Sequence, residues 1–146
     1  MKYKRIILPL SIASILLLTG CSPSLTKPDI TNIEDTAEVL VYREFSLNKL
    51  GATVYFGEDK KKYFKLSNND YGVIKMSSGF HKINIGTPNN PYKLSVNLEK
   101  GQRACFQAKP KFSLIGGVIG FMSSLFTLEK VDCPSEKFLK KLEKIN

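Results

Sequence analysis

The sequence contains one histidine, His81, and no recognisable catalytic or metal-binding motif around it. A catalytic histidine needs a nucleophile and an orienting group nearby, and a metal site needs several ligands at suitable spacing. No H-x-x-x-H, G-x-S-x-G or paired-cysteine ligand pattern occurs, and no pair of carboxylates stands out. These absences argue against an enzyme, a metal site or a cofactor. Because His81 opens a predicted strand after a glycine turn, we expect it to make structural hydrogen bonds.

Charged residues are absent from residues 6–18, which follow a basic start that contains Lys2, Lys4 and Arg5. A positive start, an apolar run and small residues at a cleavage site are the order that a secretory signal requires. The run is too short to span a bilayer, which needs about 20 apolar residues. We therefore expect residues 1–20 to be a signal peptide that is removed.

The end of that signal, Leu18-Thr19-Gly20-Cys21, resembles the lipobox of bacterial lipoproteins. The resemblance implies cleavage between Gly20 and Cys21, transfer of diacylglycerol to the Cys21 thiol and further acylation, by palmitate for example. Each buried methylene contributes about 0.8 kcal/mol, so a multiply acylated cysteine holds a protein on a membrane permanently. Ser22 after the cysteine, in place of aspartate, implies a position on the outer membrane, facing the periplasm. The alternative is a plain secretory signal with an accidental cysteine.

Cysteines are few, because the sequence has three, and acylation of Cys21 leaves Cys105 and Cys133. An oxidising envelope allows such a pair to form a disulfide. Closing the loop between them would stabilise the fold by roughly 3.5 kcal/mol in the chain-entropy treatment. The alternative is two small buried thiols that do not meet.

Acidic residues are also few, because the sequence has 13 of them and 22 lysines and arginines, which gives a net charge of +9. Removal of three basic residues with the signal lowers the net charge to +6 (22 − 3 − 13). Basic surfaces attract nucleic acid through phosphate contacts, but an envelope location argues against that partner. The anions within reach are lipid headgroups, lipopolysaccharide and cell-wall polymers. The alternative is a well-solvated surface without a specific partner.

Residues 21–36 are polar and without periodicity, so we expect a lipidated, flexible tether. Residues 37–146 are long enough for one domain with a modest core. Short runs of β-forming residues recur about every ten residues, as in an all-β sandwich or barrel. Two of the breaks, at 57–60 and 67–70, have the composition of hairpin turns. The seven expected strands are 37–43, 52–58, 62–66, 71–76, 80–85, 92–98 and 103–108.

The C-terminal dozen residues have the pattern of an amphipathic helix. Phe138, Leu142 and Ile145 form one stripe, and lysines line the other side. We expect this helix to dock on the sandwich with its lysines in solvent, and the alternative is a basic helix that lies on an anionic membrane. The predicted fold class is mainly β, a seven- to eight-stranded antiparallel β-sandwich with a C-terminal amphipathic helix.

A second stretch without charge covers residues 112–128 and is rich in glycine. Gly116 and Gly120 have the small-xxx-small spacing of membrane helix pairs, but the stretch is short for a span. Three interpretations remain: a partly buried strand-loop-strand element, an exposed apolar patch that contacts a partner or copies of itself, and insertion into the bilayer. The candidate contact residues are Leu114, Ile115, Val118, Ile119, Phe121 and Met122.

Several short patterns resemble an uncharacterised β-sandwich domain of bacterial lipoproteins, a domain-of-unknown-function family. They are Tyr42-Arg43 after an apolar strand, Gly-Ala-Thr-Val-Tyr at 51–55, the lysine turn at 60–62, Tyr71-Gly72, and Ser78-Gly79-Phe80-His81. The family usually has Pro-Gly-Lys-His at the last place, so this chain departs from the pattern there. The resemblance implies a transthyretin-like or carboxypeptidase-regulatory-like sandwich over about 37–146, and it implies no activity.

The expected function is a non-enzymatic, lipid-anchored module of the cell envelope. It would hold a partner, or a second copy of itself, near the membrane through residues 112–128. The alternative is binding of a small hydrophobic or glycan ligand between the sheets or under that stretch. The aromatic residues that could line such a site, although most are expected in the core, are Tyr55, Phe56, Tyr63, Phe64, Tyr71 and Phe80.

Overall fold

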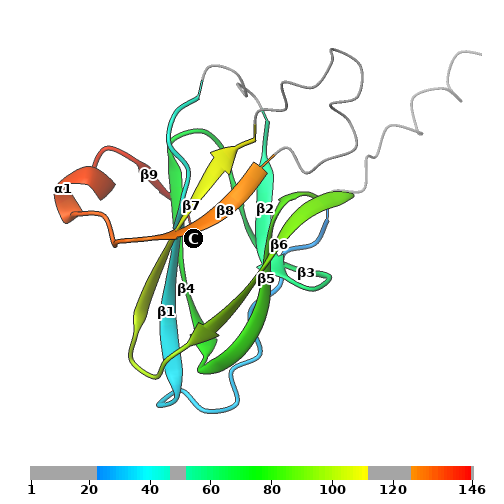
Figure 1. Cartoon of the computed structure of the whole chain (residues 1–146), viewed down its shortest axis with the longest axis vertical. Coiled ribbons are helices and arrows are strands. Elements are labelled where there is room, and N and C mark those ends of the chain that lie inside the picture. Colours follow the sequence, from blue (N-terminus) through cyan, green and yellow to red (C-terminus); the bar gives the residue numbers. More distant parts are fainter. Residues whose placement is uncertain (1–22, 47–51, 112–125, 146) are drawn as a thin grey trace, which may run out of the picture.

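The computed structural model describes residues 23–46, 52–111 and 126–145. Its strands form two sheets that face each other across a common core (Figure 1). A five-stranded sheet has the order β8-β7-β1-β4-β9, and a four-stranded sheet has the order β3-β2-β5-β6. The mainly β sandwich predicted from the sequence is confirmed. The strands are β1 (Thr36–Tyr42), β2 (Val54–Glu58), β3 (Lys61–Leu66), β4 (Asp70–Ser77), β5 (Gly79–Thr87), β6 (Asn90–Leu98), β7 (Arg103–Pro110), β8 (Phe126–Val131) and β9 (Glu143–Ile145).

The first seven strands correspond to the seven expected ones, with slightly different ends. The eighth, β8, begins in the uncharged stretch, and its Phe126 and Leu128 are buried. The sheets are not purely antiparallel, because β1 runs parallel to β7 and β4 runs parallel to β9. Parallel neighbours require a long connection, and both pairs join parts of the chain that are distant in sequence.

One of the two expected hairpin turns joins paired strands. Asp59, with a φ of 48°, lies in the turn between the antiparallel strands β2 and β3. The hairpin prediction at 67–70 is wrong, because that turn carries the chain to the other sheet, where β4 pairs with β1. There the Asp70 carboxylate accepts from the Ser67 amide at 2.6 Å, and the Asp70 carbonyl accepts from the Arg43 amide at 2.9 Å. These bonds direct the chain towards β1.

A bulge in the four-stranded sheet sets which side chains of β3 face the core. Phe56 is opposite Phe64 and Gly57 is opposite Lys62, so Tyr63 is an extra residue between the two pairs. The rings of Tyr63 and Phe64 both contact Phe56, with centroids 6.3 and 5.1 Å away. The bulge therefore turns two successive aromatic side chains inward and places Lys62 on the outer face. The buried core residues are Ala37, Val39, Val41, Val54, Phe56, Tyr63, Phe64, Leu66, Met76, Ile83, Ile85, Leu98, Ala104, Phe106, Ala108, Phe126 and Leu128.

The outer face of the five-stranded sheet is covered by the C-terminal segment. Leu139 of the short helix α1 (Glu136–Leu139) forms a second apolar cluster with Leu40, Tyr42 and Cys105. The neighbouring Phe138 ring lies edge-on to the Tyr42 ring, with centroids 5.6 Å apart. The middle of this sheet is consequently buried on both of its faces.

The length predicted for the C-terminal amphipathic helix is wrong. After α1 the chain turns and forms β9, parallel to the start of β4, and the Glu143 amide donates to the Asn69 carbonyl at 2.7 Å. The edge of a sheet offers backbone partners to an added strand, whereas a helix of a few turns gains little because its nucleation is costly. Phe138 therefore packs on the outer face while Ile145 reaches the main core, and the two do not share one helical stripe.

Arg43, directly after β1, is fully buried. Its Nη1 donates to the Ala52 carbonyl, and its guanidinium lies 4.7 Å from the centroid of the Phe126 ring. Burial lowers the pKa of Arg43, and the nearby Asp70 carboxylate acts in the opposite direction. Arg43 of the Tyr42-Arg43 pattern thus connects the end of β1 to Phe126 of β8 and to Ala52, which lies two residues before β2.

Candidate functional site

Among the predicted site residues, the structure describes the two later cysteines and joins them. Cys105 of β7 and Cys133, which follows β8, form a disulfide with a Cα–Cα distance of 5.1 Å. The predicted pairing is confirmed. Within the part of the chain that the structure describes, no helix is long and apolar enough to cross a membrane. The predicted residues outside the described ranges are Gly20, Cys21, Leu114, Ile115, Val118, Ile119, Phe121 and Met122.

The two ends of segment 112–125 meet the fold at one place. Strands β7 and β8 are antiparallel, with Pro110 opposite Phe126. Cys105 is opposite Val131 at the other end of the same strand pair, next to the disulfide. Because Phe126 and Leu128 are buried, they belong to the domain core and are not available for contacts with a partner.

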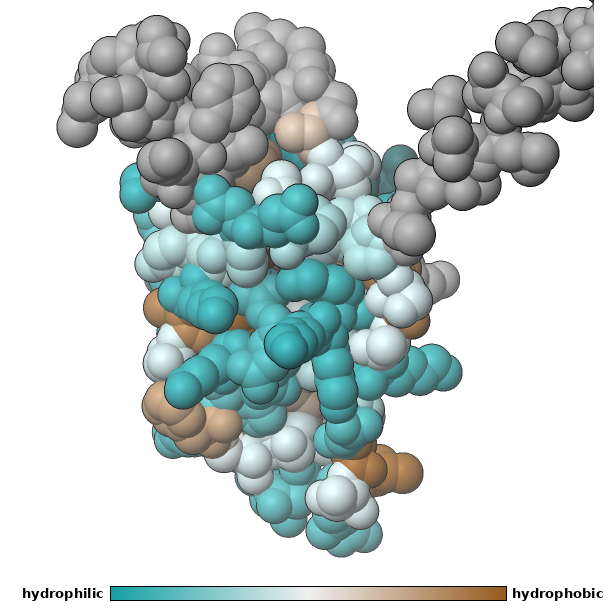
Figure 2. Space-filling model, turned by 90° about the vertical axis from the view of Figure 1, so that its right-hand side faces the viewer, coloured by the Kyte–Doolittle hydropathy of each residue, from teal (hydrophilic) through white to brown (hydrophobic). Residues whose placement is uncertain are grey.

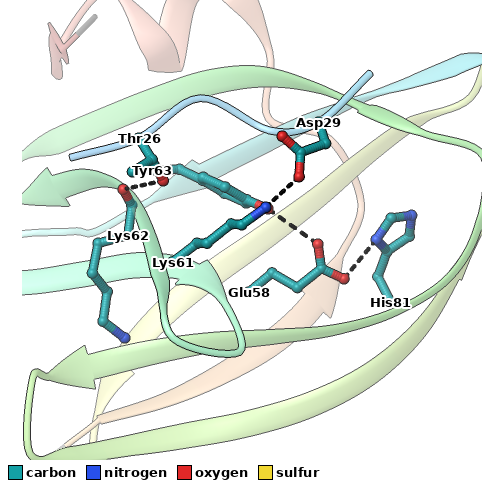
Figure 3. Close-up of polar contacts among 7 residues, drawn as sticks. All are labelled: Thr26, Asp29, Glu58, Lys61, Lys62, Tyr63 and His81. Atoms are coloured by element: carbon teal, nitrogen blue, oxygen red, sulfur yellow. Dashed lines mark hydrogen bonds and ion pairs between the residues drawn. The ribbon is translucent and has the colours of Figure 1, made fainter. Parts of the chain in front are cut away.

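Within residues 23–35, which the sequence places in a flexible tether, Leu25, Thr26 and Asp29 contact β3 of the four-stranded sheet. Leu25 forms a parallel β-bridge with Lys62, and the Thr26 amide donates to the Lys62 carbonyl at 2.7 Å. Asp29 forms an ion pair with Lys61 (Figure 3). The first half of this segment is therefore attached to the edge of β3, whereas its end is attached to Ser78, whose amide donates to the Asp35 carbonyl at 3.0 Å.

Under this segment, three side chains form a polar cluster between the sheets, which we call the Glu58 cluster (Figure 3). Glu58 Oε2 accepts from the Tyr63 hydroxyl at 3.1 Å, and Glu58 Oε1 lies 2.8 Å from His81 Nδ1. Burial and the negative Glu58 carboxylate raise the pKa of Tyr63 far above its usual range. Tyr63 therefore keeps its proton and remains a hydrogen-bond donor to Glu58.

Both ring nitrogens of His81 face acceptors. Nδ1 faces the Glu58 carboxylate, and Nε2 lies 2.9 Å from the backbone carbonyl of Ser77 in β4. Whichever ring nitrogen carries a proton donates to the acceptor that it faces. His81 thereby links β5 with β2 of its own sheet and with β4 of the facing sheet. This geometry supports the structural role expected for His81.

The space beside the Glu58 cluster is small. The cavity has a volume of about 60 Å³ and is closed on one side by Pro28 and Asp29. A water molecule occupies roughly 30 Å³, so the cavity has room for about two water molecules and not for an organic substrate. No group of three or more His, Cys, Asp or Glu side chains within the described ranges is placed to hold a metal ion.

A larger groove runs between β3 and β4, beside the N-terminal segment. Its volume of about 530 Å³ is in the range of small-molecule sites. Of the six aromatic candidates, Tyr63 and Phe64 line this groove, whereas Phe56 is fully buried and Phe80 is exposed on the outer face of the sheet. The lining residues are Leu25, Thr26, Lys27, Pro28, Ile30, Tyr63, Phe64, Val73, Ile74 and Lys75.

Sequence analysis did not single out four lysines that share the outer face of the four-stranded sheet. We call Lys62, Lys65, Lys82 and Lys93 the lysine face. Their cross-strand neighbours are Gly57, Tyr55, Ser95 and Asn84, respectively. For Lys82 and Lys93 the signal was the alternation of lysine with apolar residues along β5 and β6. The position of Lys62 depends on the bulge in β3, and no pattern in the sequence predicts that bulge.

No family model matches this chain, and no curated protein or solved structure matches it. The resemblance to the uncharacterised lipoprotein domain therefore stays a prediction. Because a β-sandwich supports many unrelated functions, function has to be inferred from the residues of the sites described above.

Proposed function

We propose that the chain is a lipid-anchored protein of the cell envelope with a non-enzymatic, structural or partner-binding role. The observation that carries the proposal is the disulfide between Cys105 and Cys133. Disulfides persist in oxidising compartments such as the periplasm and are rare in the cytosol. The pairing also leaves Cys21, in the lipobox pattern, as the remaining cysteine of the sequence. Ser22 after it favours the outer membrane, with the domain facing the periplasm.

The contacts of the Glu58 cluster support a role other than catalysis. The two nitrogens of His81 and the hydroxyl of Tyr63 are engaged by Glu58 and Ser77, and the adjoining cavity has room only for water molecules. A general base needs a free nitrogen or oxygen within reach of a substrate proton. The cluster instead connects the two sheets, which fits a stable binding or structural module.

The anchor is tested by labelling cells with an alkyne-bearing fatty acid. The wild type should carry the label and sediment with membranes, whereas Cys21→Ala should carry none. Cys105→Ser with Cys133→Ser is the matched control, because it removes two cysteines and leaves the lipobox intact, so it should still be labelled. A labelled, shortened Cys21→Ala protein in the membrane fraction would contradict the proposal.

The partner contact is tested by cross-linking in intact cells. Because β8 begins at Phe126, the variant should change only the six contact candidates of segment 112–125, each to serine. We expect loss of the cross-linked species and unchanged thermal unfolding of the domain. The matched control is Lys137→Ser with Lys140→Ser, two exposed residues of the C-terminal segment. Cross-linking that is unchanged in the six-serine variant would rule out this segment as the contact.

The groove between β3 and β4 favours a second candidate function, binding of a small hydrophobic or glycan ligand. Native mass spectrometry of protein extracted from cells should then show a mass above that of the chain. Leu25, which is 49% exposed and lines the groove, is suited to a test because Leu25→Asp makes the groove polar. Ile33→Asp is the control, since Ile33 is 77% exposed and does not line the groove. A wild type without added mass would count against this candidate.

A further inference from the structure

The lysine face is a basic surface without acidic side chains of its own sheet. The register of β2, β3, β5 and β6, all of which lie in the described part of the chain, leaves no Asp or Glu among their outward-facing residues. Figure 2, which shows the side of the molecule at the right of Figure 1, displays hydrophilic side chains gathered across the middle of that side. The lysines of this sheet therefore lie on one side of the sandwich, and at its rim Lys93 shares a surface pocket with Glu58 and Asp59.

Lys62 and Lys93 show how this charge is arranged. Lys62 is 7% exposed, and its Nζ donates to Asn84 Oδ1 at 3.0 Å. Figure 3 shows that its side chain points away from Asp29 and Glu58, in contrast to Lys61. Burial and the neighbouring positive charge of Lys93 lower the pKa of Lys62. Two like charges thus lie close together over a neutral amide, and an anion on this surface would relieve their repulsion.

The outer face of the other sheet is different. There Arg103 pairs with Glu38 at 2.8 Å and Lys109 pairs with Glu129 at 2.5 Å. That face is also covered by the C-terminal segment. The contrast within one molecule indicates that the lysine face is open to an anionic partner.

We propose that the lysine face lies on the anionic phosphate headgroups of the membrane to which Cys21 anchors the chain. The proposal rests on the proposed function, because it takes the position of the membrane from the lipid at Cys21. Its second support is the attachment of Leu25 to Lys62 at the edge of the same sheet.

Chain length limits how far this sheet can be from the anchor. Four peptide units separate Cys21 from Leu25, and n residues span at most about 3.5 Å each, so whatever their conformation they reach about 14 Å. Electrostatic attraction to an anionic surface decays over about 8–10 Å at physiological salt. Leu25 and the edge of β3 therefore stay within about 14 Å of the acylated residue, which allows the lysine face to reach the headgroups, where each lysine strengthens membrane binding several-fold.

The test measures membrane binding by the lysine face in a protein that carries no lipid anchor. The mature chain with Cys21→Ser, which cannot be acylated, is sedimented with vesicles that contain phosphatidylglycerol and with vesicles of phosphatidylcholine only. In that background, Lys65→Gln, Lys82→Gln and Lys93→Gln remove three exposed charges and leave buried Lys62 in place. The matched control is Lys137→Gln, Lys140→Gln and Lys141→Gln, which removes the same charge from the C-terminal segment.

We expect binding to the anionic vesicles only, weakened by salt. The partition coefficient should fall about 100-fold in the lysine-face variant and much less in the control, at about five-fold per membrane-facing lysine. An equal fall in both variants, or equal binding to both vesicles, would overturn the proposal. Circular dichroism and thermal unfolding verify that each variant is folded.

A second readout uses the acylated protein in the same vesicles. A membrane-impermeant amine reagent should modify Lys65, Lys82 and Lys93 more slowly on anionic vesicles than on neutral ones, and Lys137 equally on both. Failure of fatty-acid labelling at Cys21 together with intact vesicle binding would contradict the proposed lipid anchor and still support membrane binding by the lysine face. Successful labelling of Cys21 without protection of the lysine face would support the lipid anchor and contradict membrane binding by the lysine face.

Discussion

Leu25 forms a parallel β-bridge with Lys62, at the edge of the four-stranded sheet. The adjacent hydrogen bond from the Thr26 amide to the Lys62 carbonyl is 2.7 Å long. The two contacts attach the N-terminal segment to one sheet only a few residues after the predicted acylation site. A lipid at Cys21 would therefore orient the sandwich and not merely tether it.

Thr26→Pro should detach this segment while the sandwich remains folded. Proline has no N–H, so the bond to the Lys62 carbonyl is lost, whereas Thr26→Ala keeps the backbone donor. A hydrogen bond contributes about 1 kcal/mol, so amide exchange of residues 25–33 should accelerate about five-fold in the proline variant. Hydrogen–deuterium exchange with mass spectrometry measures this rate. Equal exchange in the proline and alanine variants would show that the bridge does not hold the segment.

Gly72→Ala should destabilise the domain by about 2 kcal/mol, a typical cost of overpacking a core. A methyl group at Gly72 would lie 2.7 Å from Cε2 of the Phe64 ring, which is stacked on Phe56. Urea unfolding gives the free energy of each variant. In the double variant with Phe64→Leu, the alanine should cost much less, because the smaller side chain leaves space for the methyl group. A cost that is the same in both backgrounds would exclude the ring contact as the cause.

Replacement of both Cys105 and Cys133 by alanine should lower the free energy of unfolding by roughly 3.5 kcal/mol in the chain-entropy treatment. Denaturant unfolding of the oxidised wild type, the reduced wild type and the double variant measures the effect. The reduced wild type and the double variant should behave alike. A reductant that leaves the wild-type midpoint unchanged would contradict the disulfide's contribution.

Tyr63→Phe should show a stability difference that depends on pH. At neutral pH the variant lacks the hydrogen bond to Glu58 and should be less stable by about 1 kcal/mol. The folded pKa of Tyr63 is raised, so above pH 10 the unfolded chain loses the phenol proton while the folded protein keeps it. The wild type then loses stability with rising pH, and its advantage over the variant shrinks. An equal loss of stability in the wild type and the variant between pH 9 and 11 would argue against the raised pKa of Tyr63.

Local patterns predicted the strands well. On β6, for example, Leu94 and Val96 are partly buried while Lys93, Ser95 and Asn97 are exposed, as the alternation indicates. The disulfide was also predictable, because the cysteine count left one pair. In both cases the information lies within a few residues or in a count, so no knowledge of distant contacts is needed.

Pairing between distant segments was not predictable from such patterns. The turn at 67–70 has a hairpin composition, but nothing in it says that β4 belongs to the other sheet. Ile145 fits a helical stripe with Phe138 and Leu142, but residues 143–145 form a strand because the edge of β4 is available at Asp70–Gly72. Whether these residues form a helix or a strand depends on the free edge of β4, which is distant in sequence, so local patterns do not predict the outcome.

The secretory and lipobox pattern, the mainly β composition and the lone pair of later cysteines are properties of the linear chain, and they led to the predicted location and the fold class. The lysine face and the Glu58 cluster arise from cross-strand register and from the bulge at Phe56 and Gly57. A shift of one residue in a strand moves a side chain to the opposite face. For that reason the outward position of Lys62 and the meeting of Glu58 with His81 emerged only when the sheets were assembled.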